Sequence, residues 1–218
     1  MPGGILLEFP ELFFTGLWLT IQLSVLGFAG ALAAGTAVAL FRISPVPPLR
    51  WLGAAFVEFF RNTPLLVQLF FLFFGPIRFS GDTFENIFRA GAIGMAMYHG
   101  AYVAEVIRGG LIGIDKGQVE AARSLGLSYL QTLRHVQLPQ TFRATIPPLG
   151  NIGIALIKNT SLASTIGVAE LLQAAEIVES RTFRAEEAFG AAVLLYLLLT
   201  LPSSVGVNWL ERRLLIAR

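Results

Sequence analysis

The chain has 218 residues, of which 55% are hydrophobic and only 14% are charged, and its formal net charge is +2. A composition this apolar excludes an ordinary soluble domain and indicates a protein that lies in a lipid bilayer. No cysteine is present, which excludes disulfides and thiol chemistry.

Five stretches of the chain are apolar and long enough to cross a membrane, because a hydrocarbon core about 30 Å thick requires roughly 20 helical residues. In chain order they are residues 12–41, 51–77, 86–107, 144–168 and 188–210. No hydrophilic stretch between them is long enough for a separate folded unit. We therefore predict an all-α membrane protein with about five transmembrane helices in a single transmembrane domain, residues 1–218.

The first 41 residues contain no Lys or Arg, whereas Glu8 and Glu11 carry negative charge. A cleaved signal peptide begins with positive charge, so we expect the first span to be retained. Gly27, Ala31 and Gly35 recur every four residues and place small side chains on one helix face. This stripe predicts close packing against another helix.

The second and third stretches contain two charged pairs. Glu58 and Arg61 are three residues apart and share a helix face, where opposite charges offset part of each other's desolvation cost. Glu105 and Arg108 have the same spacing. Either these pairs shape an inner gate or a partner contact, or their side chains only reach for the membrane surface.

Three uncharged polar side chains also interrupt these two stretches, namely Gln68 in the second and Tyr98 and His99 in the third. Either they line a transport pathway or they form hydrogen bonds between helices.

A hydrophilic segment, residues 110–143, separates the third and fourth stretches. Within it Leu125, Tyr129 and Leu133 recur every four residues, which predicts an apolar ridge on one helix face. Gly126 interrupts good helix formers, and we expect it to bend the segment between two helices. The ridge suits either the groove of a partner protein or the surface of a bilayer.

Lys158 lies near the middle of the fourth stretch. Inserting an ammonium group at the centre of a membrane helix costs a free energy of at least about 2.5 to 3.5 kcal/mol. Asn159, Thr160 and Ser161 beside it supply hydrogen-bond donors and acceptors. Transporters place substrate sites at this depth on polar groups, so these four residues are candidates for binding a charged substrate. Alternatively, Lys158 pairs with a carboxylate or with helix carbonyls and only holds the bundle together.

Basic residues predict the orientation, because Lys and Arg accumulate in short loops that stay in the cytoplasm. With the N-terminus outside, the inner segments contain Arg42, Arg50, Arg61, Arg108, Lys116, Arg123, Arg134, Arg143, Arg212, Arg213 and Arg218, and the outer segments contain only Arg78, Arg89, Arg181 and Arg184. We therefore predict an outer N-terminus, a cytoplasmic C-terminus and a cytoplasmic segment 110–143. The acidic outer stretch 170–187 is expected to meet a partner or solvent.

The cytoplasmic segment contains Glu120-Ala121-Ala122, then Gly126, and finally Val136-Gln137-Leu138-Pro139. This pattern resembles the loop Glu-Ala-Ala-x3-Gly-x9-Ile-x-Leu-Pro of permease subunits of ATP-binding cassette importers, with Val136 in place of Ile. Residues 58–68, 101–110, 116–122 and 158–171 are similar to the branch of binding-protein-dependent inner membrane components that imports polar amino acids. The resemblance covers residues 51–213.

This resemblance implies a type I importer permease fold, with a cytoplasmic coupling loop at about residues 110–143 between spans 3 and 4. It implies that coupling to the ATPase involves Glu120, Ala121, Ala122, Arg123, Leu125, Gly126, Tyr129 and Leu133. The implied partners are a second permease subunit, identical or different, two ATP-binding subunits and an extracytoplasmic solute-binding protein. The implied location is a bacterial inner, or cytoplasmic, membrane. ATP and Mg²⁺ would bind to the partner subunits, and no cofactor is expected in this chain.

An enzyme is the main alternative from another class. The chain lacks a Gly-x4-Gly-Lys-Ser/Thr loop for ATP phosphates, and two histidines without cysteine give little for a metal site. An intramembrane serine hydrolase would have to pair Ser161 or Ser164 with His99. An autonomous channel is opposed by the coupling loop. We therefore expect a transporter subunit with no catalytic residues, no metal site and no nucleic-acid partner.

Overall fold

The computed structural model describes residues 2–75 and 84–214, apart from the side chains of residues 2, 3 and 84. All regular structure in these ranges is helical. The α-helices are α1 (Pro2–Glu8), α2 (Pro10–Ile43), α3 (Pro47–Asn62), α4 (Leu65–Phe74), α5 (Phe84–Ile112), α6 (Lys116–Ser124), α7 (Tyr129–Thr132), α8 (Leu138–Asn159), α9 (Leu171–Thr182) and α10 (Ala185–Leu214). A π-helical turn, η1 (Leu133–Gln137), joins α7 to α8, and a 3-10 helix, η2 (Thr160–Ile166), follows α8.

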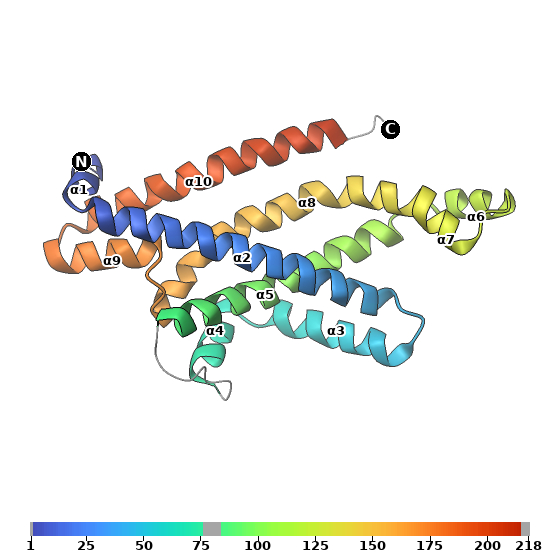
Figure 1. The fold of residues 1–218 in the computed structure, drawn as a ribbon, viewed down its shortest axis with the longest axis horizontal. Coiled ribbons are helices and arrows are strands. Elements are labelled where there is room, and N and C mark those ends of the chain that lie inside the picture. The colour runs from blue at the N-terminus through green and yellow to red at the C-terminus, as the bar shows by residue number, and fades with distance from the viewer. Residues whose placement is uncertain (1, 76–83, 215–218) are drawn as a thin grey trace.

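The helices form an elongated bundle (Figure 1). Helices α6 and α7 project at one end, while α1 and α9 lie at the other, and α10 runs from the α1 end toward the α6 end. Three buried apolar clusters follow one another along α2 and contain Phe13, Leu23 and Val38 respectively. The core is therefore a row of contacts along one long helix.

Helices α2 and α5 pack against each other through the predicted stripe of small residues. A Cβ atom on Gly27 would lie 2.9 Å from Met95 Cβ, and one on Gly35 would lie 2.6 Å from Gly100 O. Ala31 is fully buried between them. The close approach that the spacing predicted is confirmed.

The number of membrane-length helices agrees with the predicted count. Helices α2 and α10 are each long and apolar enough to cross a membrane. The pairs α3 with α4 and Tyr129–Ile166 with α9 also qualify when each bent pair is taken as one span. Helix α5 has 29 residues, about 44 Å of helix, and is the remaining membrane-length helix. The prediction of an all-α protein with about five spans is confirmed.

The second span is not the single helix predicted for residues 51–77. Helices α3 and α4 meet at 105°, because Pro64 lacks an N–H and keeps Thr63 in extended backbone, at φ −114° and ψ 141°. The span also begins earlier, at Pro47, and its expected end at Ile77 lies outside the described residues.

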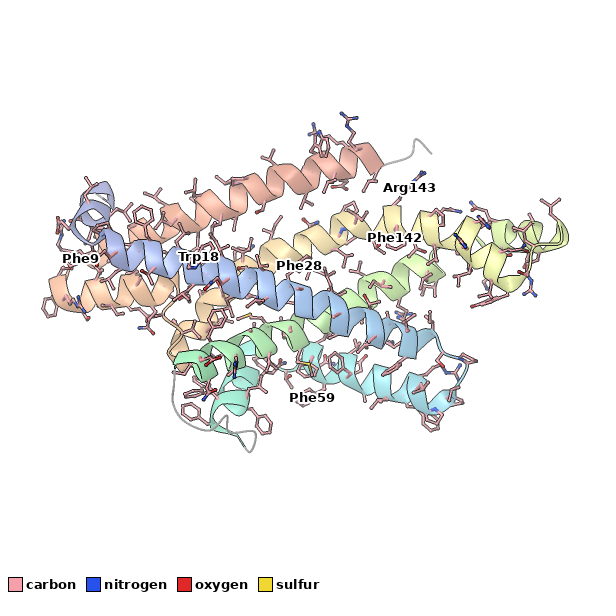
Figure 2. All side chains as sticks on the ribbon, in the orientation of Figure 1. Phe9, Trp18, Phe28, Phe59, Phe142 and Arg143 are labelled. Carbon is pink, nitrogen blue, oxygen red and sulfur yellow. The ribbon has the colours of Figure 1, made fainter. Side chains whose placement is uncertain are left out.

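Many large apolar side chains stand off the sides of the bundle (Figure 2). Trp18, Phe59 and Phe142 are each more than half exposed in the isolated chain. Such a surface is stable only against lipid or another subunit.

Candidate functional site

The hydrophilic segment predicted to be cytoplasmic folds into two short helices joined by a sharp turn, which we call the coupling arm, residues 115–137. Asp115 caps α6 by accepting from Gly117 N at 2.6 Å. Gly126 then takes φ +86°. Ser128 and Gln131 form a reciprocal capping box at the start of α7. The bend predicted at Gly126 is confirmed.

The apolar ridge predicted on one helix face does not form, because the turn at Gly126 separates its members. Leu125 caps the end of α6, whereas Tyr129 lies on α7 and Leu133 begins η1. Leu125, Tyr129 and Leu130 are 82%, 64% and 72% exposed, and Leu133 is half-buried. We call the three exposed residues the apolar tip.

Other residues of the predicted coupling set have different surroundings. Glu120, Ala121 and Arg123 are exposed on α6, while Ala122 is 7% exposed. Leu127 N donates to Ala122 O at 3.2 Å, which folds the turn back on α6. Ala122 therefore packs inside the coupling arm. Glu120, Ala121 and Arg123 are exposed and are available for contact with a partner.

A side chain at position 126 that resists left-handed backbone should misplace α7. We expect Gly126→Val to cost about 1–2 kcal/mol of local stability and to reduce stimulated ATP hydrolysis by the assembled transporter, although nothing lies within 4 Å of an added Cβ. Gly126→Asn is the control, because Asn tolerates positive φ better. Equal ATPase activity in the two variants would contradict a role for the backbone turn.

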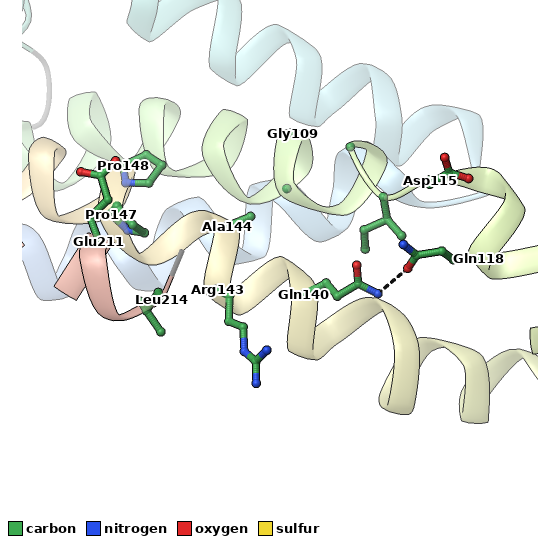
Figure 3. Close-up of a pocket in the computed structure, with 13 residues that line it drawn as sticks. Gly109, Asp115, Gln118, Gln140, Arg143, Ala144, Pro147, Pro148, Glu211 and Leu214 are labelled. Atoms are coloured by element: carbon green, nitrogen blue, oxygen red, sulfur yellow. Dashed lines mark hydrogen bonds between the residues drawn. The ribbon is translucent and has the colours of Figure 1, made fainter. Parts of the chain in front are cut away.

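A groove of about 900 Å³ lies between the arm and the main bundle (Figure 3). The ends of α5 and α10, the start of α8 and part of α6 line it. Gln140 Nε2 donates to Gln118 Oε1 at 2.7 Å and ties α6 to α8 on one wall. Arg143 stands at the rim with its guanidinium pointing away (Figure 3). This hydrogen bond links the coupling arm to the base of α8.

Glu105 is the centre of a charge cluster that joins three helices. Arg42 from α2 and Arg108 from α5 itself both donate to its carboxylate, Arg108 at 2.8 and 3.1 Å. Arg61 from α3 lies 3.9 Å from the same group. The predicted pairing of Glu105 with Arg108 is confirmed, and the cluster has three guanidinium groups around one carboxylate.

The other predicted pair, Glu58 with Arg61, does not form. Glu58 Oε2 instead accepts from Asn62 at 2.8 Å, and Arg61 lies 5.3 Å from the centre of the Tyr102 ring. Spacing of three residues permits such a pair, but Glu105 on a neighbouring helix attracts Arg61 and Asn62 satisfies Glu58. Arg61 therefore belongs to the Glu105 cluster.

Gln68 supports the bend in the second span. Its side chain is 6% exposed, and its Nε2 donates to Phe60 O at 3.0 Å and to Thr63 O at 3.1 Å. These carbonyls lose their helical partners where Pro64 breaks the chain. Gln68 thus stabilises the break, which favours the alternative of a hydrogen bond between helices.

His99 connects α5 to the end of α8. Its Nδ1 lies 2.9 Å from Met95 O, and since a carbonyl only accepts, Nδ1 carries the proton. Nε2 then accepts from Asn159 Nδ2 at 3.1 Å. Both ring nitrogens have partners, so His99 is not free to act as a base toward Ser161 or Ser164, and Tyr98 bonds to Tyr102 at 3.2 Å.

Residues 158–161, which we call the polar segment, end α8 and begin η2. Lys158 is exposed in the isolated chain, and no carboxylate pairs with it in the residues that the structure describes. Thr160 donates to Ile157 O at 2.7 Å and Ser161 to Lys158 O at 2.8 Å. The alternative in which a carboxylate of this chain holds Lys158 is therefore not supported.

Glu170 is a polar residue whose position the sequence did not reveal. It was expected in an outer segment that meets a partner or solvent, yet it is 0% exposed and caps α9 inside the bundle. The sequence offered one indication of this position, because Glu170 follows Gly167 by three residues and a glycine can mark a break in a helix. In the structure Gly167 takes φ +91° at the break in the fourth span.

A membrane bundle with a bent fourth span and an exposed coupling arm between its third and fourth spans defines a transport permease subunit. Residues 27–216 match the family described as binding-protein-dependent transport system inner membrane component, and the chain belongs to this family. It is a subunit of an ATP-binding cassette importer that works with an ATPase and a substrate-binding protein, and not an enzyme.

Known relatives resemble the chain over nearly its whole length. It is 41% identical to a probable glutamine ABC transporter permease of Bacillus subtilis, over 98% of each chain. It is 39% identical to the glutamine transport system permease of Escherichia coli, over 92% of each. A crystal structure of an amino acid ABC transporter with histidines shares 35% identity and a TM-score of 0.89, over 95% of this chain and 96% of that one.

Proposed function

We propose that this chain imports polar amino acids of the glutamine class by alternating access, paired with a second permease subunit and driven by two ATPase subunits. The apolar tip is the observation that carries this proposal. Three large apolar side chains exposed on a hydrophilic arm match the groove of a partner protein better than water. Relatives named for glutamine support the substrate class.

The basic residues support a cytoplasmic arm. Lys116, Arg123 and Arg134 lie on the arm, and α1, with no basic residue, lies at the opposite end of the bundle (Figure 1). We therefore place the N-terminus outside and the last turn of α10 in the cytoplasm of a bacterium. ATP and Mg²⁺ then bind to the partner subunits below the arm, and a solute-binding protein docks at the α1 and α9 end.

Lys158 supports a substrate contact within the membrane. An ammonium group at this depth requires a polar partner, and no carboxylate pairs with it in the described part of the chain. The α-carboxylate of an amino acid supplies that partner, with Asn159 and Ser161 nearby for the polar side chain. The second permease subunit covers the remaining exposed face.

Removing the ammonium group should reduce uptake more than it reduces stability. We expect Lys158→Met to lower amino-acid uptake by at least about tenfold, because a hydrogen bond to a charged group contributes about 1.5–3 kcal/mol. Lys158→Arg is the control and should keep most uptake. Normal uptake by the Met variant in proteoliposomes would remove Lys158 from the substrate site.

The function is tested by reconstituting the permease with its ATPase and solute-binding protein in proteoliposomes. ATP hydrolysis and uptake are measured across a panel that includes glutamine, glutamate, asparagine, histidine and leucine. We expect the polar amino acids to stimulate both activities and leucine to stimulate neither. If no amino acid stimulates hydrolysis, the assignment of the substrate class fails; passive flux without the ATPase would indicate a channel.

A further inference from the structure

A network of hydrogen bonds meets at the buried carboxylate of Glu170. Oε1 accepts from Gln173 N at 3.0 Å and so caps α9. Oε2 accepts from the Tyr196 hydroxyl on α10 at 2.5 Å and from the Thr20 hydroxyl on α2 at 3.4 Å. One side chain thus connects α2, α9 and α10 at the point where the fourth span is broken.

Helix α2 also contacts the backbone of this break. Thr20 Oγ1 accepts from Leu171 N at 3.1 Å while it donates to Glu170. One turn earlier, a Cβ atom on Gly16 would lie 3.0 Å from Glu170 O, so only a small residue allows this approach. The break is therefore held by directional bonds and by close backbone packing.

No cation neutralises Glu170 within the part of the chain that the structure describes. Its carboxyl oxygens accept from hydroxyl and amide donors and lie at the N-terminal end of α9. A buried carboxylate is an expensive way to hold helices together, and apolar packing would serve stability equally well. The carboxylate differs from apolar packing because its hydrogen bonds are directional, and each of them fixes the relative position of a different helix.

The polar segment lies just upstream of this network. Asn159 is bonded to His99 on α5, and η2 leads from Thr160 to Gly167 and then to Glu170. Residues 158–161 are therefore bonded to α5 through Asn159 and lie on the chain just before the Glu170 network.

We propose that Glu170 is a positioning residue that sets the geometry of the polar segment through η2, with Thr20 and Tyr196 as its supports. This inference rests on the proposed role of Lys158 in binding substrate. Glu170 itself does not contact substrate, since it is fully buried.

The experiment uses the absence of cysteine in the chain. Ser161→Cys introduces a thiol into the polar segment of the full complex, assembled with cysteine-free partner subunits, and its rate of reaction with a maleimide reports the position of the segment. The rate is compared in the Thr20→Val, Tyr196→Phe and Glu170→Gln backgrounds. Thr200→Val is the matched control, because the buried Thr200 hydroxyl on α10 bonds, within the residues that the structure describes, to Tyr196 O of its own helix alone.

We expect the three network variants to change the maleimide rate by at least about threefold, since each removes or weakens a buried hydrogen bond of the network. Thr200→Val should leave the rate unchanged, and Thr20→Ser, which keeps the hydroxyl, should restore it. Unchanged rates in folded network variants, with only a lower melting temperature, would overturn the proposal. If the unmodified complex imports no amino acid while the rates still change, the proposed function fails and the positioning role stands.

Discussion

The double substitution Leu125→Asp and Tyr129→Asp is expected to abolish ATP-driven uptake while the membrane domain stays folded. These side chains are 82% and 64% exposed in the isolated subunit, so charge at these positions costs the fold little. At an interface, large apolar anchors each contribute about 2 kcal/mol or more. Affinity for the ATPase should therefore fall by at least about a hundredfold.

The measurement is co-purification of the ATPase with the permease, followed by ATP hydrolysis in proteoliposomes. Leu7→Asp is the matched control, because Leu7 is 84% exposed at the opposite end of the bundle. It should leave ATPase binding intact. If the double variant retains the ATPase and loses only its association with lipid, the apolar tip rests on the bilayer surface instead.

The substitution Glu105→Gln should destabilise the membrane domain by about 2 kcal/mol. Breaking a buried ion pair by removing one partner costs about 3–5 kcal/mol, and we reduce this value because the cluster side chains are 18–42% exposed. The loss is large because Arg42, Arg61 and Arg108 would then face one another with no carboxylate between them.

Thermal unfolding of the purified permease in lipid nanodiscs measures this effect. The control is Glu85→Gln, since Glu85 and Arg89 form an exposed pair within α5 and such pairs contribute about 0–1 kcal/mol. Adding Arg42→Gln to Glu105→Gln should recover part of the stability by relieving repulsion. Equal melting temperatures for Glu105→Gln and Glu85→Gln would show that the cluster contributes no more than a surface pair.

Local patterns in the sequence were sufficient to predict the fold class and the position of the coupling arm. The lengths of the apolar stretches gave the number of spans, and the spacing from Glu120 to Pro139 resembled one family. Gly126 predicted a bend, whereas the apolar periodicity predicted one continuous helix face, and the two predictions were incompatible. The backbone turn at Gly126 forms and the continuous ridge does not, so Leu125 and Tyr129 are both exposed but belong to different helices.

Contacts between distant helices could not be predicted from one sequence. Arg61 was assigned to Glu58 because the two are close in the chain, whereas the folded bundle brings it to Glu105. Glu170 was assigned to the acidic outer stretch 170–187 because it follows the fourth apolar stretch, and only the packing of α2 and α10 shows that it is buried. In both cases the decisive partner comes from another helix.

The helical path from Tyr129 to Ile166 is continuous through η1, α8 and η2. It spans about 55 Å at 1.5 Å per residue and turns by about 100° at each residue. The angle between Tyr129 of the apolar tip and Lys158 around the helix axis is therefore fixed by the number of residues between them. One added or missing residue would swing Lys158 by more than a quarter turn, so this stretch of the chain has to keep its length as strictly as its composition.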